Sequence, residues 1–381
     1  MSKHFENIIG IIRQRYGAGQ IPLHAPVFRG NEKKYTNLAI DSTFVSSVGE
    51  YVNQSEKMLA EFTGAKYAVA TGNGTSALHA ALVVAGVQAN DLVITQPFTF
   101  VATANAVAYC HAEPVFVDID KDTLGLSAEK LKLFLEKEAH INDQGICIHK
   151  ATGRTIRACL PMHSFGLVCR IKEIANICKN YNIVLVEDAA ESIGSYVGNI
   201  HTGLIGQLGT LSFNGNKTIT CGGGGAIITN DEAIAKKAKY ITTTAKVPHA
   251  YEFFHDELGY NYRLPNLNAA LLCAQIEQLD GFLKNKAETA NFYHQEFAKN
   301  NIEFVKNLEG TTSNYWLNCV LLKDRNERDA FLKYSNENGV MTRPAWTLMT
   351  KLPMYEHCIK GSIDNALEME NRLVNIPSSV L

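Results

Sequence analysis

Residues 183–192 read IVLVEDAAES. Their first four positions form a near-continuous apolar run, which is typical of a strand buried on both faces of a parallel sheet. Asp188 follows where this strand is expected to end. Ligands bind at the carboxyl ends of the strands in open α/β sheets, so Asp188 is predicted at the ligand-binding edge. An aspartate that only caps the next turn is the alternative.

The chain on both sides of this stretch alternates between strand-like and helix-like segments from about residue 50 to 240. The other expected strands are 66–73, 91–97, 113–120 and 158–163, and the expected helices are 52–64, 74–87, 99–110, 127–138 and 171–182. Strands separated by helices predict βαβ units with right-handed crossovers. The predicted fold class is therefore α/β, with a mostly parallel sheet covered on both faces.

Two regions depart from this rhythm. Residues 138–157 are polar and rich in turn formers, and we expect a surface excursion or hairpin there. From about residue 245 a long helical tract, 264–300, is followed by a strand-like run and a helix. We therefore expect a large domain over residues 1–245 and a smaller C-terminal α+β domain over residues 246–381.

Composition narrows the class of protein. The 381 residues are 46% hydrophobic and 19% charged, with a formal net charge of −2, which fits a globular enzyme and not a basic nucleic-acid or membrane-surface protein. The N-terminus lacks the features of a signal peptide, and no apolar run is long enough for a bilayer. The nine cysteines include no CxxC pair, so we expect no metal site and a cytoplasmic protein.

The stretch ATGNGTSAL, residues 70–78, places Gly74, Thr75 and Ser76 where a strand gives way to a helix. Free backbone N–H groups, two hydroxyls and the helix dipole there would suit a phosphate. An ordinary helix cap explains the same residues if they are taken alone. Phe100, after the strand that ends near Pro97, is either a core residue or a flat wall for a planar ring.

A second glycine-rich stretch, SFNGNKTITCGGGGAIIT, spans residues 212–229 and contains one lysine, Lys217. A solvated loop is the simplest explanation of a lysine beside glycines. The alternative is an amine held near a cofactor aldehyde, beside backbone that must turn tightly. Ser212, at the end of the preceding strand, would then lie near a phosphate.

These features follow one another in a single order, and the chain resembles the fold-type-I pyridoxal-phosphate enzymes of the aspartate aminotransferase superfamily. Within it, the sequence from residue 21 to residue 379 is similar to the DegT/DnrJ/EryC1/StrS nucleotide-sugar aminotransferases. Six segments resemble the branch that makes UDP-linked 4-amino sugars of the bacillosamine and legionaminic acid type. They are STFVSSVG (42–49), SFNGNKTIT (212–220), TTTAKVPH (242–249), GYNYRLPNLNAA (259–270), SNYWLN (313–318) and NGVMTRPAW (338–346).

The resemblance implies a role for each candidate residue. Lys217 would form the Schiff base with pyridoxal phosphate, Asp188 would pair with the ring nitrogen, and Phe100 would stack on the ring. The phosphate would be held by Thr75, Ser76 and Ser212, with Gly74 allowing close approach. Family sites are shared across a homodimer, and Asn261 is the residue expected to reach the partner's phosphate.

Two positions depart from the family pattern. Glu191 stands where a glutamine commonly contacts the cofactor hydroxyl, and Gly223 replaces a glutamate within the glycine run. Both put a family contact in doubt, whereas the lysine and the aspartate are intact.

The expected activity is transfer of an amino group from L-glutamate to C4 of a UDP-4-keto-6-deoxy-N-acetylhexosamine, with Lys246 and Arg343 as candidate diphosphate contacts. A dTDP- or GDP-linked keto sugar, aminated at C3 or C4, is the alternative on the same fold. A sugar dehydratase would replace Lys217 by histidine, and a non-catalytic regulator would not need the intact set. A nicotinamide oxidoreductase is disfavoured, because the sequence lacks the G-x-G-x-x-G loop that binds the dinucleotide.

Overall fold

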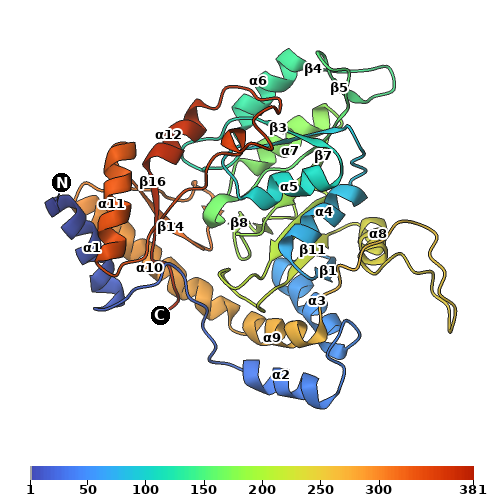
Figure 1. Cartoon of the computed structure of the whole chain (residues 1–381), viewed down its shortest axis with the longest axis horizontal. Coiled ribbons are helices and arrows are strands. Elements are labelled where there is room, and N and C mark those ends of the chain that lie inside the picture. The colour runs from blue at the N-terminus through green and yellow to red at the C-terminus, as the bar shows by residue number, and fades with distance from the viewer. Residues whose placement is uncertain (1) are drawn as a thin grey trace.

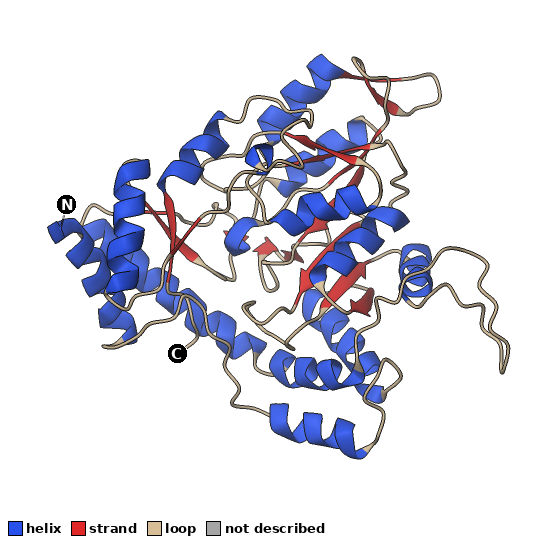
Figure 2. Cartoon of the chain, in the orientation of Figure 1, coloured by secondary structure: helices blue, strands red, loops and turns tan. Residues whose placement is uncertain are grey.

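A seven-stranded sheet organises the chain, which this computed structural model describes from residue 2 to residue 381 (Figures 1 and 2). In spatial order the strands are β1 (Tyr67–Thr71), β11 (Gly225–Thr229), β10 (Leu208–Ser212), β7 (Val184–Asp188), β6 (Ile156–Cys159), β2 (Leu92–Thr95) and β3 (Glu113–Phe116). The pairings from β10 to β3 are parallel, and β11 is antiparallel to both of its neighbours. The predicted, mostly parallel α/β sheet is confirmed.

Strand side chains alternate between two apolar clusters, which is why both faces of the sheet are buried. In β2, Leu92 and Ile94 belong to a cluster with two helices on one face, while Val93 belongs to a cluster with helices on the other. The first cluster includes side chains of α6 (Ala128–Glu138) and α7 (Ile171–Asn180). The second includes side chains of α4 (Gly74–Val84), α5 (Val101–Tyr109) and α8 (Glu232–Thr242).

The polar excursion expected over residues 138–157 forms a hairpin of β4 (Ala139–Ile141) and β5 (Cys147–His149). The three-stranded sheet β13-β8-β9 consists of β13 (Thr311–Thr312), β8 (Tyr196–Val197) and β9 (Ile200–His201). Two short 3-10 helices, η1 (Ser164–Gly166) and η2 (Met349–Lys351), complete the connections. None of the helices in residues 2–381 is both long and apolar enough to cross a membrane.

A second sheet of four strands forms in the C-terminal part, with helices packed around it. Its strands in order are β12 (Glu303–Phe304), β14 (Asn318–Leu321), β16 (Leu373–Ile376) and β15 (Arg343–Pro344). The remaining helices are α1 (Ser2–Tyr16), α2 (Glu32–Asp41), α3 (Glu50–Thr63), α9 (Asn266–Ile276), α10 (Leu279–Lys299), α11 (Arg325–Glu337) and α12 (Asp364–Arg372). The single helical tract expected over residues 264–300 is thus two helices.

The division into residues 1–245 and 246–381 stays a prediction, and two helices pack across it. Helix α1 lies beside α10 and α11, where Phe5 and Ile8 share a buried cluster with Phe331 (Figure 1). Helix α9 packs against α2 and α3 of the larger part. At the junction between α9 and α10, Glu277 accepts hydrogen bonds from Asn31 and Tyr35 just before and within α2.

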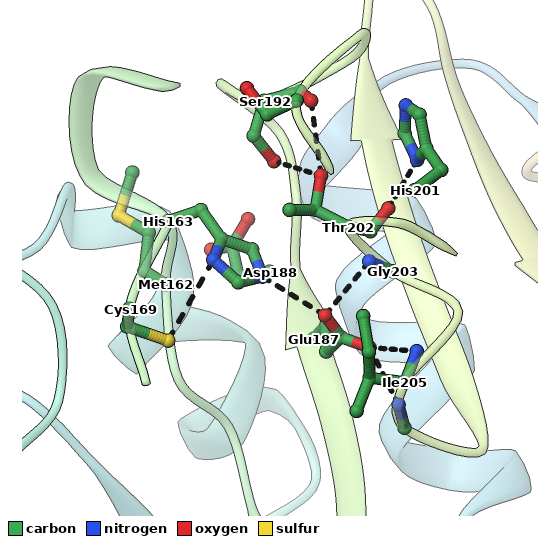
Figure 3. Close-up of polar contacts among 12 residues, drawn as sticks. Met162, His163, Cys169, Glu187, Asp188, Ser192, His201, Thr202, Gly203 and Ile205 are labelled. Carbon is green, nitrogen blue, oxygen red and sulfur yellow. Dashed lines mark hydrogen bonds and ion pairs between the residues drawn. The ribbon is translucent and has the colours of Figure 1, made fainter. Parts of the chain in front are cut away.

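The end of β7 is fixed by the buried carboxylate of Glu187 (Figure 3). This carboxylate accepts backbone N–H groups of Gly203, Ile205 and Gly206 at 2.6–2.8 Å, and His163 Nε2 lies 3.0 Å from it. A carboxylate removed from water requires such donors. Glu187 therefore holds the loop at residues 203–206 and the segment at His163 against the strand that ends in Asp188.

Close backbone approach explains part of the glycine run. A Cβ atom on Gly225 would lie 2.6 Å from the carbonyl atoms of Asn73, and one on Gly74 would lie 2.8 Å from Cβ of Ser212. These contacts bring the start of α4 against β10 and β11. Gly223 differs, because its nearest neighbour would be the Gly72 carbonyl oxygen at 3.7 Å, an ordinary contact.

Replacement of Glu187 by alanine should lower the free energy of unfolding by about 3–5 kcal/mol, because it leaves the buried His163 and three backbone N–H groups, one buried and two partly buried, without their acceptor. Glu187→Gln should not restore stability, since both carboxylate oxygens accept hydrogen bonds and an amide offers one acceptor. Denaturant unfolding measures both losses. The exposed Glu61→Ala is the control, with a change within about 0.5 kcal/mol. An equally small loss in Glu187→Ala would contradict the assignment.

Gly225→Ala should lower the free energy of unfolding by about 1–3 kcal/mol, since the added methyl group overlaps the Asn73 backbone. Gly223→Ala is the matched control within the same run and should change it by about 0.5 kcal/mol or less. Thermal and denaturant unfolding of the two variants measure these changes in the free energy of unfolding. Equal losses would show that close packing is not what the run provides at Gly225.

Candidate active site

A cavity of about 310 Å³ lies where β7 and β10 end, at the edge predicted from the parallel strands. The predicted residues that line it are Gly74, Thr75, Phe100, Asp188, Glu191, Ser212 and Lys217. A larger hollow of about 510 Å³ beside α6 is lined by none of the predicted site residues. Among residues 2–381 no group of His, Cys, Asp or Glu side chains is arranged to hold a metal ion.

The N-terminus of α4 forms one wall of this cavity. Asn73 caps the helix, and its side-chain oxygen accepts the backbone N–H of Ser76 at 2.8 Å. Thr75 and Ser212 line the cavity beside this helix end, whereas Ser76 is not among its lining residues. Backbone N–H groups, a helix dipole and hydroxyls at one place are the chemistry of a phosphate site.

Asp188 is buried at the base of the cavity. Its Oδ2 accepts a hydrogen bond from Thr103 Oγ1 at 2.7 Å, and its Oδ1 accepts the Ala190 N–H at 3.1 Å. Burial raises the pKa of Asp188 above its usual value, and these two hydrogen bonds offset only part of the effect. A cation placed against this carboxylate would therefore be strongly stabilised.

Lys217 approaches the cavity from the loop after β10. Its Nζ lies 3.1 Å from Glu191 Oε1 and 4.0 Å from the centroid of the Trp316 ring. The Glu191 carboxylate also accepts the backbone N–H of Phe165 at 2.8 Å. Burial raises the pKa of Glu191 to about 7, against the opposing effect of Lys217. The cavity therefore holds a lysine amine, which can act as a nucleophile, next to a carboxylate that can accept a proton.

Phe100 is half exposed and immediately precedes helix α5, so its ring is available as a wall of the cavity. Thr103, in the first turn of α5, was not predicted from the sequence. Its i, i+3 spacing from Phe100, the residue that caps this helix, places the two residues on one side of it. Trp316 and Trp346 were also missed. They come from the C-terminal part, and no local pattern links them to the strands.

Besides Ser76, three predicted residues do not line this cavity of their own chain. Asn261 is exposed and accepts a hydrogen bond from Arg263 Nε at 2.9 Å. Lys246 Nζ lies 4.0 Å from the centroid of the Phe253 ring, and Arg343 is exposed and bonded to Asn336 Oδ1 at 3.1 Å. The structure of one chain therefore gives these residues no contact with the cavity.

Comparison with known proteins identifies the family of the chain. The sequence model of the DegT/DnrJ/EryC1/StrS aminotransferase family matches residues 27–381. A GDP-perosamine synthase of Vibrio cholerae is 35% identical over 94% of each chain. A UDP-4-amino-4,6-dideoxy-N-acetyl-beta-L-altrosamine transaminase of Campylobacter jejuni is 35% identical over 66% of this chain and 63% of its own.

Solved structures support the same fold. A DegT DnrJ EryC1 StrS aminotransferase from Brucella abortus superposes with a TM-score of 0.81 at 26% identity, covering 91% of this chain and 90% of its own. The Helicobacter pylori aminotransferase PseC has a TM-score of 0.84 at 22% identity over 94% and 93% of the two chains. The expected fold type I and the expected pyridoxal-phosphate cofactor are confirmed. The chain belongs to the DegT/DnrJ/EryC1/StrS family and is a pyridoxal-phosphate-dependent sugar aminotransferase.

Proposed function

We propose that the protein transfers an amino group from L-glutamate to C4 of a GDP-linked keto sugar, and that the cavity at the ends of β7 and β10 is where it does so. The observation that carries the site is the meeting of Lys217, Asp188 and the N-terminus of α4 in one cavity. Pyridoxal phosphate has an aldehyde, a basic ring nitrogen and a phosphate. The amine, the buried carboxylate and the helix end match these three groups.

Each residue then has a defined task. Asp188 would keep the ring nitrogen of the bound cofactor protonated, and Phe100 would pack against the ring. Thr75 and Ser212, which line the cavity, would bind the phosphate, with Ser76 next to them in the first turn of α4 and Gly74 allowing close approach to Ser212. Lys217 holds the cofactor and later moves a proton at the substrate carbon. The cofactor itself supplies the electron sink.

The choice of GDP revises the UDP-linked sugar expected from the sequence. The GDP-perosamine synthases of Vibrio cholerae and Escherichia coli O157:H7 match over 94% of this chain, whereas the UDP-sugar relative of Campylobacter matches over 66%. Amination at C4 is supported by that UDP-sugar relative, which is a transaminase of a 4-amino-4,6-dideoxy sugar. A UDP-linked acceptor is the second candidate.

We also propose a homodimer with shared sites. The arm that follows α8 projects from the body of the chain (Figure 1) and exposes Tyr251, Phe253 and Leu258 at 79–81%. Apolar side chains this exposed favour a covering partner surface. The cavity of one chain is not lined by Asn261, Lys246 or Arg343. We assign Asn261 to the cofactor phosphate in the partner's site, and Lys246 and Arg343 to the diphosphate of the substrate.

A substrate panel tests the function. Wild-type enzyme loaded with pyridoxal phosphate and given L-glutamate should aminate a GDP-linked 4-keto sugar with a kcat/KM about tenfold or more above those of UDP- and dTDP-linked 4-keto sugars. Product amine and 2-oxoglutarate are measured together. A preference for the UDP-linked sugar would overturn the GDP assignment and leave the aminotransferase intact.

The matched controls in that assay are Lys217→Ala and Asp188→Asn. Lys217→Ala should lose both turnover and the visible absorption band of lysine-bound cofactor. Asp188→Asn is nearly isosteric, so it should fold and bind the cofactor but lose most of its turnover. Normal turnover in either variant would remove that residue from the site.

Mixing two inactive variants tests the shared site. Lys217→Ala chains and Asn261→Ala chains should each be inactive, but hybrid dimers contain one site with both residues. Random mixing should therefore recover about a quarter of wild-type activity. Hybrids that are shown to form yet stay inactive would place Asn261 outside the partner's site.

A further inference from the structure

The amine of Lys217 has one polar partner in the described chain, and that partner is ionisable. Glu191 Oε1 lies 3.1 Å from Nζ, and the Glu191 side chain is 1% exposed while that of Lys217 is 12% exposed. The Trp316 ring, 4.0 Å from Nζ, adds a cation–π contact that also favours an ammonium group. Both contacts stabilise a positive charge at Nζ.

Glu191 is held in place from both its side chain and its backbone. The Phe165 N–H donates to Oε2 at 2.8 Å, and the Asn314 amide donates to the Glu191 carbonyl oxygen at 2.9 Å. The same amide group lies 3.3 Å from Oγ1 of Thr218, the residue after Lys217. One buried asparagine therefore links the backbone of Glu191 to the segment that carries Lys217.

Other titratable groups surround the pair of Glu191 and Lys217 and affect the charge on Glu191. Asp188 faces Glu191 and disfavours a second carboxylate charge, while His163 lies near Asp188. The charges of Lys217 and Lys286 both act on His24, and Cys319 is near Glu191. The cavity thus contains two carboxyl groups and one lysine. If a protonated ring nitrogen paired with Asp188, Glu191 would be the carboxyl group left to compensate a positive charge on Lys217.

We propose that Glu191 is the proton partner of Lys217: its carboxylate holds the amine as an ammonium group, and it accepts a proton when the amine must act. This inference rests on the proposed role of Lys217. In the step, an N–H bond of the ammonium breaks and an O–H bond forms on Glu191. A neutral amine and a neutral carboxylic acid result, so the buried site gains no net charge. A glutamine at this position could not accept the proton.

The raised pKa of Glu191, about 7, places such an acceptor near neutral pH, where proton exchange in both directions is easy. The contact that the structure gives the Glu191 carboxylate inside the cavity is with Lys217, so Glu191 acts through that residue. Its test must read protonation and not only turnover.

The experiment labels lysines of the cofactor-free protein with acetic anhydride between pH 5 and pH 10 and follows the Lys217 peptide by mass spectrometry. Loss of an opposite charge 3–4 Å away favours the neutral amine, so Glu191→Gln should lower the labelling midpoint of Lys217 by about one pH unit or more. Glu191→Asp keeps the charge and should retain a high midpoint. The same order should hold for the pH at which the visible band of the loaded protein changes.

Glu370→Gln is the matched control, because Glu370 is a buried glutamate paired with Lys351 elsewhere in the fold. It should leave the Lys217 midpoint unchanged. Equal midpoints in wild type and Glu191→Gln would overturn the inference, and so would an Asp variant that behaves as the Gln variant does. Failure of the proposed function looks different, since Lys217→Ala would then keep the visible band.

Discussion

Burial of three carboxyl groups at the end of one strand is the constraint on which the site depends. Glu187, Asp188 and Glu191 all lie at the end of β7 or directly after it, and none is more than 3% exposed. Each must be compensated, because an ionised carboxylate without partners is strongly disfavoured in the interior. Glu187 has three backbone N–H groups and His163, and Glu191 has Lys217 and one N–H. Asp188 has only a hydroxyl and one N–H, so it is the carboxyl group left to bind a cation from outside the chain.

The hydrogen-bond partners of the three carboxyl groups distinguish the one that stabilises the fold from the two that face the cavity. Glu187 is fully used by the fold and positions the strand end, while Glu191 and Asp188 face the cavity with incomplete compensation. Perturbed carboxyl groups in a cleft are typical of functional sites. The end of β7 and the turn after it therefore contribute Glu187, which stabilises the fold, and Glu191, whose burial is offset by Lys217. Asp188 is the carboxyl group that would pair with the ring nitrogen of the cofactor under the proposed function.

Local sequence patterns predicted what depends on local structure. The apolar run at 183–186 predicted a buried strand, and the position of Asp188 at its end followed from the topology of parallel sheets. Asn73, Thr75 and the glycines likewise lie at a strand-to-helix turn that the sequence indicates. The contact between Lys217 and Glu191, 26 residues apart, and the approach of Trp316, about 100 residues further on, depend on tertiary packing and leave no local signal. Lys246 and Arg343 were chosen by resemblance, and one chain alone does not bring them to the cavity.

Reduction of the loaded protein with borohydride, followed by peptide mapping, tests the central claim most directly. Borohydride fixes the cofactor to the lysine that holds it, so the modified peptide identifies that residue without any assay of turnover. The account predicts a single phosphopyridoxyl group on Lys217. Modification of another lysine, such as the buried Lys286, or no modification of a protein that shows the visible band, would contradict it.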